Sequence, residues 1–178
     1  MVSAPEIVTE RLLLVAATPA HFDALIDGDP EGFRAALGAA PPDPFAPPPL
    51  TDDVIAWFRD QLLETPALQT WLFRWMIARR DRATLGSLGF AGPPDEHGVV
   101  TIGYLVYPAH EGKGYASEAV TRLIAWALAQ PGVRAVQATI KPDNAASRRV
   151  AERAGFTRAG AVQSRDEGLL DLWERRAD

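Results

Sequence analysis

Apolar residues in the first third of the chain form one short block, followed by segments with helical spacing. Residues 12–15 are a continuous apolar run between polar positions, which predicts a first strand. Thr-Pro at 18–19 and Asp-Pro at 29–30 each place a capping side chain before a proline, the usual start of a helix. The proline-rich stretch at 41–49 predicts an extended, stiff loop, and helical spacing resumes after Thr51.

From residue 70 onward the pattern changes to short apolar blocks separated by turn residues. Residues 71–78, 84–91 and 99–107 are such blocks, and consecutive strands joined by turns predict an antiparallel meander. Between 116 and 128 apolar residues recur every three or four positions, which predicts a helix with one buried face.

The last part of the chain predicts a return to the same sheet. Proline and glycine at 131–132 end the helix, and the strand expected at 133–140 follows a helical crossover, so it should run parallel to the strand before that helix. A last helix is expected at 143–155, before two strands at 156–164 and 169–175.

These elements predict one domain over residues 1–178. The fold class is α/β (α+β), with a mixed, mostly antiparallel sheet of about seven strands flanked by helices. No apolar run reaches the roughly 18 residues that span a bilayer, and the N-terminus lacks the basic and apolar regions of a secretory signal. We therefore expect a cytoplasmic protein with no membrane partner.

Composition excludes several kinds of chemistry. The chain has no cysteine, which rules out disulfides, a thiolate nucleophile and a Cys-ligated metal, and no metal site is predicted. The formal net charge of −5 argues against a nucleic-acid partner, because binding to phosphate backbones needs a basic face. The same charge is compatible with a cationic substrate.

The strongest functional signal is the segment EGKGYA at 111–116, between a predicted strand and a predicted helix. A turn with two glycines leaves backbone N–H groups free, and the positive end of the helix dipole adds to their attraction for a phosphate or pyrophosphate. An isolated G-x-G is most often an ordinary turn. The strand before it and the helix after it favour the phosphate site here.

Two pairs of segments carry a resemblance to a known family. IGYLVYP at 102–108 and EGKGYASEA at 111–119 together resemble the acetyl-CoA-binding core of the GNAT N-acetyltransferase superfamily. NAAS at 144–147 and ERAGF at 152–156 are similar to the next block of that superfamily, at a matching spacing. The resemblance implies a GNAT-type sheet that is splayed at its central parallel pair.

The N-terminal part resembles one branch of the superfamily. TERLLL at 9–14 and GFAG at 89–92 are typical of the branch that includes the ribosomal-protein N-terminal acetyltransferases. The likeness covers nearly the whole chain.

The resemblance also implies a site. The pyrophosphate of acetyl-CoA is expected on the backbone N–H groups of 112–116, and the pantetheine arm along the end of the preceding strand. The N–H of Val106 would stabilise the oxyanion. Asn144 and Ser147, which are also candidate catalytic residues, would reach the cofactor from the facing helix. Tyr104 is a weaker catalytic candidate, with a core or wall position as the alternative. The implied cofactor-binding residues are Leu105, Val106, Tyr107, Gly112, Lys113, Gly114, Tyr115, Ala116, Asn144 and Ser147.

Several positions depart from the family pattern or allow a second interpretation. Glu111 stands where Gln or Arg is frequent, and its carboxylate is expected to face solvent. Thr101 replaces a glutamate common in this branch, and Ala151 stands where other branches have a tyrosine general acid. Asn144 is equally well suited to cap a helix, and Ser147 to satisfy a local backbone group. The acid–base residues therefore stay open.

Outside this segment, the side chains suggest ordinary structural roles. His21 is expected to be exposed, and Glu118 and Arg122 to form an exposed i,i+4 pair. Trp71 and Trp75 are predicted on one strand, in the core or lining a substrate pocket.

The function predicted from these residues is an acetyl-CoA-dependent N-acetyltransferase, in which an amine attacks the thioester directly. Only the neutral amine attacks, and an α-amine with a pKa of about 7.7–8.0 is neutral far more often at pH 7 than a lysine at about 10.4. With no evident base, the N-terminal α-amine of a protein is the favoured acceptor. Glu96, His97 and the loop around Phe45 are candidates for the acceptor side.

Alternatives to this function remain at this stage. The acceptor could be a small-molecule amine or an antibiotic, and the domain could bind acyl-CoA without catalysis. Both a monomer and a homodimer are compatible with the sequence.

Overall fold

The structure is a computed structural model that describes residues 4–45 and 50–177. The proline-rich stretch predicted at 41–49 lies partly outside these residues. Within these ranges no helix is both long and apolar enough to cross a membrane. The elements in chain order are β1 (Ile7–Val8), β2 (Leu12–Ala16), α1 (Pro19–Ile26), α2 (Pro30–Leu37), α3 (Asp52–Glu64), the 3-10 helix η1 (Pro66–Thr70), β3 (Arg74–Ala78), β4 (Thr84–Phe90), β5 (Val99–Val106), the 3-10 helix η2 (Pro108–His110), α4 (Tyr115–Leu128), β6 (Ala135–Ile140), α5 (Ala145–Arg153), β7 (Thr157–Ser164) and β8 (Gly168–Arg176).

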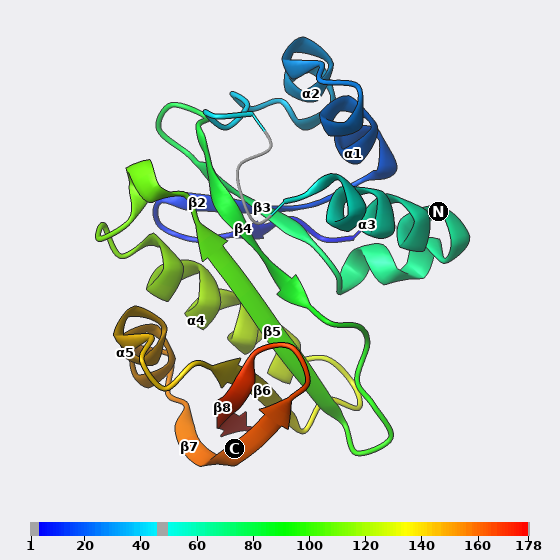
Figure 1. Ribbon diagram of the computed structural model, residues 1–178. Coiled ribbons are helices and arrows are strands. Elements are labelled where there is room, and N and C mark those ends of the chain that lie inside the picture. Colours follow the sequence, from blue (N-terminus) through cyan, green and yellow to red (C-terminus); the bar gives the residue numbers. More distant parts are fainter. Residues whose placement is uncertain (1–3, 46–49, 178) are drawn as a thin grey trace.

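The described strands form one eight-stranded sheet in the order β1-β2-β3-β4-β5-β6-β8-β7 (Figure 1). Neighbouring strands are antiparallel except β5 and β6, which are parallel and joined through α4. The predicted mixed, mostly antiparallel sheet is confirmed. Two details of the prediction were wrong. Strand β1 was not predicted, because its two residues are too few to show a hydrophobic period, and the strand expected from residue 71 begins at Arg74. Trp71 follows η1 and does not share a strand with Trp75.

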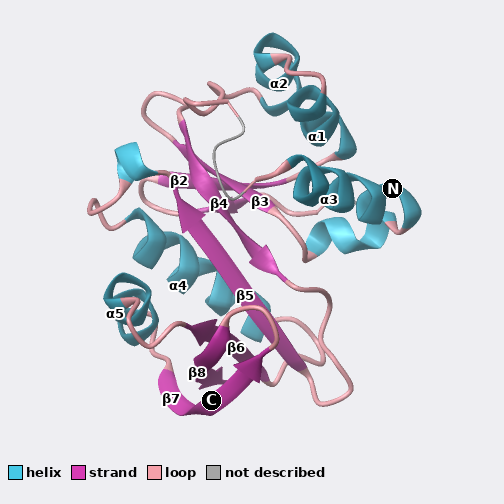
Figure 2. Cartoon of the chain, in the orientation of Figure 1, coloured by secondary structure: helices cyan, strands magenta, loops and turns pink. Residues whose placement is uncertain are grey.

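Helices on both faces of the sheet enclose two separate cores (Figure 2). One core is formed with α4 and α5, and the other with α1, α2 and α3. Strand β3 contributes to both, because successive side chains of a strand point to opposite faces. Met76 lies in the core of α4 and α5, while Trp75 and Ile77 lie in the other. The Trp75 ring is fully buried and packs edge-on against Phe33, with the ring centroids 5.1 Å apart.

The expectation that His21 is exposed was wrong. Its side chain is buried between α1 and α2, with its ring centroid 6.2 Å from that of Phe33. Nδ1 of His21 accepts a hydrogen bond from the N–H of Thr18 (3.1 Å), which helps to satisfy the first turn of α1. Burial lowers the pKa of His21 and so favours the neutral ring that can accept this bond.

Strands β5 and β6 are paired for only part of their length. Their register joins residues 99–101 to 135–137, after which β6 continues beside β8 alone. On the other edge of β5, the N–H of Tyr107 donates to Leu85, and Thr101 accepts from the N–H of Ala91, both at 2.8 Å. Antiparallel ladders alternate hydrogen-bonded and non-bonded pairs, so the backbone groups of Tyr104 and Val106 point away from β4. They face the gap that β6 leaves open.

Gly86 makes this arrangement testable through stability. It lies opposite Val106, where a Cβ atom would collide with the carbonyl oxygen of Leu105. We expect Gly86→Ala to lower the free energy of unfolding by about 1–3 kcal/mol, because the two backbones must move apart. Denaturant titration measures this change. Gly160→Ala in β7 is the control, since a Cβ atom there meets nothing within 4 Å, and equal losses in both variants would contradict the expectation.

Candidate functional site

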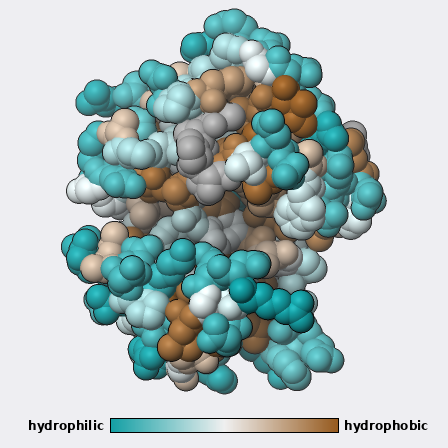
Figure 3. Space-filling view, viewed as in Figure 1, coloured by the Kyte–Doolittle hydropathy of each residue, from teal (hydrophilic) through white to brown (hydrophobic). Residues whose placement is uncertain are grey.

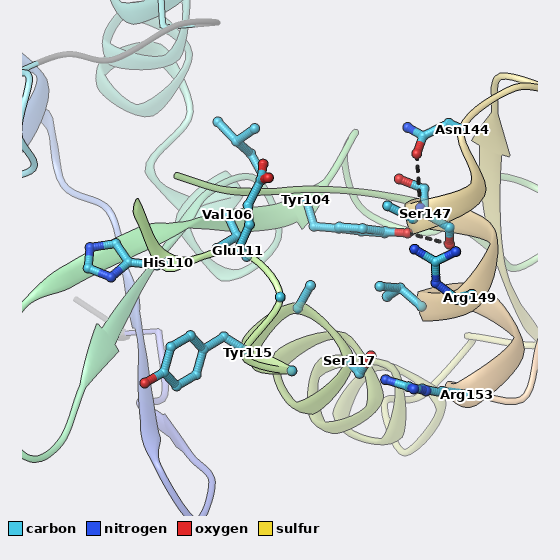
Figure 4. A pocket seen from close by; sticks show the side chains of 16 residues that line it. Tyr104, Val106, His110, Glu111, Tyr115, Ser117, Asn144, Ser147, Arg149 and Arg153 are labelled. Atoms are coloured by element: carbon cyan, nitrogen blue, oxygen red, sulfur yellow. Dashed lines mark hydrogen bonds between the residues drawn. The ribbon is translucent and has the colours of Figure 1, made fainter. Parts of the chain in front are cut away.

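A cavity of about 610 Å³ opens where β5 and β6 separate. Its walls come from the end of β5, the loop and first turn of α4, and one face of α5. Figure 4 shows the labelled side chains of β5, α4 and α5 around this space. The structure brings together every predicted site residue here except Tyr107 and Lys113.

The glycine loop forms one end of the cavity. Gly112 and Gly114 have φ angles of 72° and 82°, a left-handed conformation that glycine adopts without steric cost. In the part of the chain that the structure describes, no hydrogen bond uses the amides of residues 112–114 as donors. The helix α4 begins directly afterwards at Tyr115, so the positive end of its dipole adds to these free donors. This arrangement can bind an anion. Glu111 is exposed, as expected, and lies at the rim of the cavity.

On the opposite wall, a short chain of hydrogen bonds connects α5 to β5. Oδ1 of Asn144 accepts from the N–H of Ser147 (3.0 Å), so Asn144 does cap the helix. The carbonyl of Ser147 in turn accepts from the hydroxyl of Tyr104 (3.1 Å) (Figure 4). Burial raises the pKa of Tyr104, against the opposing effect of Ser147, so its phenol stays protonated at neutral pH. Contact of these residues with a cofactor stays a prediction.

Sequence reasoning missed two arginines that line the cavity, Arg149 and Arg153. With Ala146 and Val150 they occupy positions i, i+3, i+4 and i+7 of α5, which form one face of a helix. The signal was therefore present in the spacing, once Asn144 had fixed the start of the helix. The two guanidinium groups make the cavity suitable for phosphate groups, despite the acidic chain.

Two predicted cofactor residues lie outside the cavity lining. The side chain of Tyr107 is buried, and burial raises its pKa. The Nζ atom of Lys113 donates to the carbonyl of Ala109 (2.9 Å), so its charge stays beside the loop. His110 does line the cavity, and its pKa is lowered by burial and then by Lys113.

The expected pair between Glu118 and Arg122 was wrong. The carboxylate of Glu118 instead binds Arg11, with Nε and Oε2 2.6 Å apart. Helical spacing indicated a partner on the same helix, whereas the N-terminal turn supplies a better placed guanidinium.

A second, mostly apolar cavity of about 380 Å³ lies between α3 and strands β4 and β5. It shares Tyr104 and Leu105 with the first cavity, so the end of β5 separates the two spaces. The predicted acceptor-side residues Glu96, His97 and Phe45 line neither cavity. The described residues that line the second cavity include no acidic residue and no histidine.

Comparison with known proteins agrees with this geometry. The family model for the acetyltransferase (GNAT) domain matches residues 11–157, and the chain belongs to this family. The resemblance found in the sequence is thereby confirmed.

Individual relatives show how far the similarity extends. The uncharacterized N-acetyltransferase YjdG of Bacillus subtilis is 34% identical over 105 residues, which cover 58% of this chain and 62% of that protein. A second Bacillus subtilis relative, the uncharacterized N-acetyltransferase YoaA, is 32% identical over 51% of each chain. The matches thus span less than two thirds of these curated relatives.

Solved structures match over almost the whole chain. A putative GNAT-family acetyltransferase from Bordetella pertussis is 26% identical with a TM-score of 0.69, covering 96% of this chain and 99% of that one. The ribosomal L7/L12 α-N-protein acetyltransferase RimL, in complex with coenzyme A, has a TM-score of 0.68 at 19% identity, over 98% and 99% of the two chains. At that identity the RimL match shows a shared fold.

The cap on α5 gives a prediction that does not depend on any ligand. We expect Asn144→Ala to lower the free energy of unfolding by about 0.5–2 kcal/mol, because the N–H of Ser147 loses its acceptor. Thermal or denaturant unfolding measures the loss. Asn144→Asp keeps an acceptor and should stay near the wild type, whereas Asp143→Ala controls for a change beside the cap. A stable Asn144→Ala variant would show that the cap is dispensable.

Proposed function

We propose that this chain is an acetyl-CoA-dependent N-acetyltransferase that transfers the acetyl group to a primary amine by direct attack. The observation that carries the proposal is the pair of cavities that meet at Tyr104 and Leu105. One suits a phosphate-bearing donor and the other an uncharged, apolar group. A thioester in the first can therefore meet an amine that enters from the second.

The donor fits the first cavity in its polar groups. The free amides of 112–114 and the first-turn amides of α4 suit the pyrophosphate, and Arg149 and Arg153 suit further phosphate oxygens. The unpaired edge of β5 offers backbone groups to the amides of a pantetheine arm, as it would to another strand. Acetyl-CoA would supply an activated acetyl group, and the chain would orient it.

Transfer of the acetyl group by direct attack requires few side-chain groups. The amine nitrogen attacks the carbonyl carbon, a C–N bond forms, and the nitrogen loses a proton to water. The C–S bond breaks, and the sulfur leaves as a thiolate that takes up a proton. The N–H of Val106, which points into the gap, is our candidate donor to the oxyanion. Tyr104 keeps its proton at neutral pH, lines the cavity, and is our candidate acid for the thiolate.

The second cavity best suits an acceptor whose α-amine lies beside an apolar side chain. Because the described lining of the second cavity offers no carboxylate or imidazole as a base, an amine of low pKa is favoured. Val54 and Phe58 of α3 line the cavity, and the half-exposed Trp57 packs against Phe58 with ring centroids 5.0 Å apart. Apolar side chains also reach the surface over α1 and α3 (Figure 3), which suits a peptide that continues outward. The name of RimL describes such a reaction for that protein.

The donor site is tested by a charge in the glycine loop. We expect Gly114→Glu to abolish the binding of acetyl-CoA in calorimetry, because Gly114 lines the cavity and a carboxylate on the loop would repel the pyrophosphate expected there. Gly132→Glu is the matched control, since Gly132 also has a positive φ (84°) but lies outside the cavity. Thermal melts should show both variants folded. Unchanged affinity in Gly114→Glu would refute the donor site.

The acceptor class is tested by release of free thiol from acetyl-CoA across a panel of amines. Peptides with a free N-terminus and an apolar first residue should react at pH 7 about 200- to 400-fold faster than Nα-blocked peptides with a lysine, from the fractions of neutral amine. Turnover confined to small amines or antibiotics would replace the peptide acceptor. No thiol release above the blank with any amine would leave a binding module without catalysis.

A further inference from the structure

Arg11, in the turn between β1 and β2, reaches across to the glycine loop. Its Nη1 donates to the carbonyl oxygen of Lys113 (3.0 Å), and its guanidinium lies 4.6 Å from the centroid of the Tyr115 ring. Figure 4 shows that the Tyr115 ring is directed away from Tyr104 and Ser147. Arg11 itself does not line the cavity. It therefore touches the loop from behind.

Arg11 is held in this position by the first turn of α4. Glu118 Oε2 accepts from Nε of Arg11 (2.6 Å), while Oε1 accepts from the N–H of Arg11 (2.8 Å) and from the hydroxyl of Thr9 (2.5 Å). Burial opposes ionisation of this carboxylate, but the bonds from Thr9 and Arg11 dominate and lower the pKa of Glu118. The ion pair is thus formed at neutral pH, with Arg11 forked between Glu118 and the loop.

The bond to Lys113 fixes the direction of one amide. In a trans peptide the C=O of one residue and the N–H of the next point in opposite directions. The carbonyl of Lys113 is directed at Arg11, behind the loop, so the N–H of Gly114 is directed to the other side, where Gly114 lines the cavity. Without this bond the Lys113–Gly114 peptide could rotate, because glycine at 112 and 114 admits many backbone conformations.

We propose that Arg11, held by Glu118 and Thr9, is a positioning residue that orients the Lys113–Gly114 peptide for binding of the donor's phosphate groups. This inference rests on the proposed function, because it presumes that the loop binds coenzyme A. Its effect is on the affinity for the donor and not on the transfer step. The N–H of Gly114 is oriented before the donor binds, so binding costs less conformational entropy.

The test measures the binding of coenzyme A itself by calorimetry in the full chain. We expect Arg11→Met to raise the Kd about tenfold or more, the usual effect of losing a hydrogen bond to a charged group at a binding element. Arg11→Lys should be nearly as weak, because one ammonium cannot reproduce the fork between Glu118 and Lys113. In kinetic assays the KM for acetyl-CoA should rise, with kcat and the KM of the acceptor nearly unchanged.

Arg79→Met is the matched control. Nη1 of Arg79 donates to the carbonyls of Thr9 (3.0 Å) and Glu10 (2.8 Å), so it supports the same turn without touching the loop. Its Kd should stay within about twofold of the wild type, and thermal melts should show that all variants are folded at the temperature of the binding assay.

Three results would overturn the inference. These are an unchanged Kd in Arg11→Met, full affinity in Arg11→Lys, which would show that charge alone suffices, and an equal loss in Arg79→Met. Failure of the wild type to bind coenzyme A would instead refute the proposed function, and the inference with it.

Discussion

The separation of β5 from β6 after three paired residues is the constraint on which the rest of the site depends. It leaves backbone groups of Tyr104 and Val106 without a strand partner, and such groups cost free energy unless water or a ligand satisfies them. The same separation gives α4 room to start beside the gap, with its N-terminus toward it. One interruption in a sheet therefore creates the cavity, its polar edge and the wall shared with the second cavity.

Much of the fold could be predicted because the responsible signals are local. Hydrophobic period, Thr-Pro and Asp-Pro starts, and glycine turns each depend on a few consecutive residues, and they located the strands β2 to β8, the α-helices and the parallel crossover. The glycine loop was also found in this way, because its function resides in the backbone. The cap at Asn144 follows the same logic, and its spacing to Ser147 is visible in the sequence.

Contacts that depend on how distant elements pack could not be predicted from the sequence. His21 is buried only because α2 folds over α1, and Glu118 prefers Arg11 to Arg122 only because the β1–β2 turn lies beside α4. Helical periodicity could have placed the two arginines of α5 on one face of the helix. Their role at the site could be recognised only from the structure, which shows that this face lines the first cavity. The apolar second cavity needed α3 and the sheet together, which no single segment reveals.

Arg11 and Glu118 are 107 positions apart in the chain, and α5 adds residues further still along it. Contacts between such distant positions form only after the entropy of closing a long loop has been offset. A site built from them exists only when nearly the whole chain is in place, so a ligand that binds it binds the native state alone and stabilises that state by mass action. If that ligand is coenzyme A, as we propose, its supply in a cell would also help to set the lifetime of the protein.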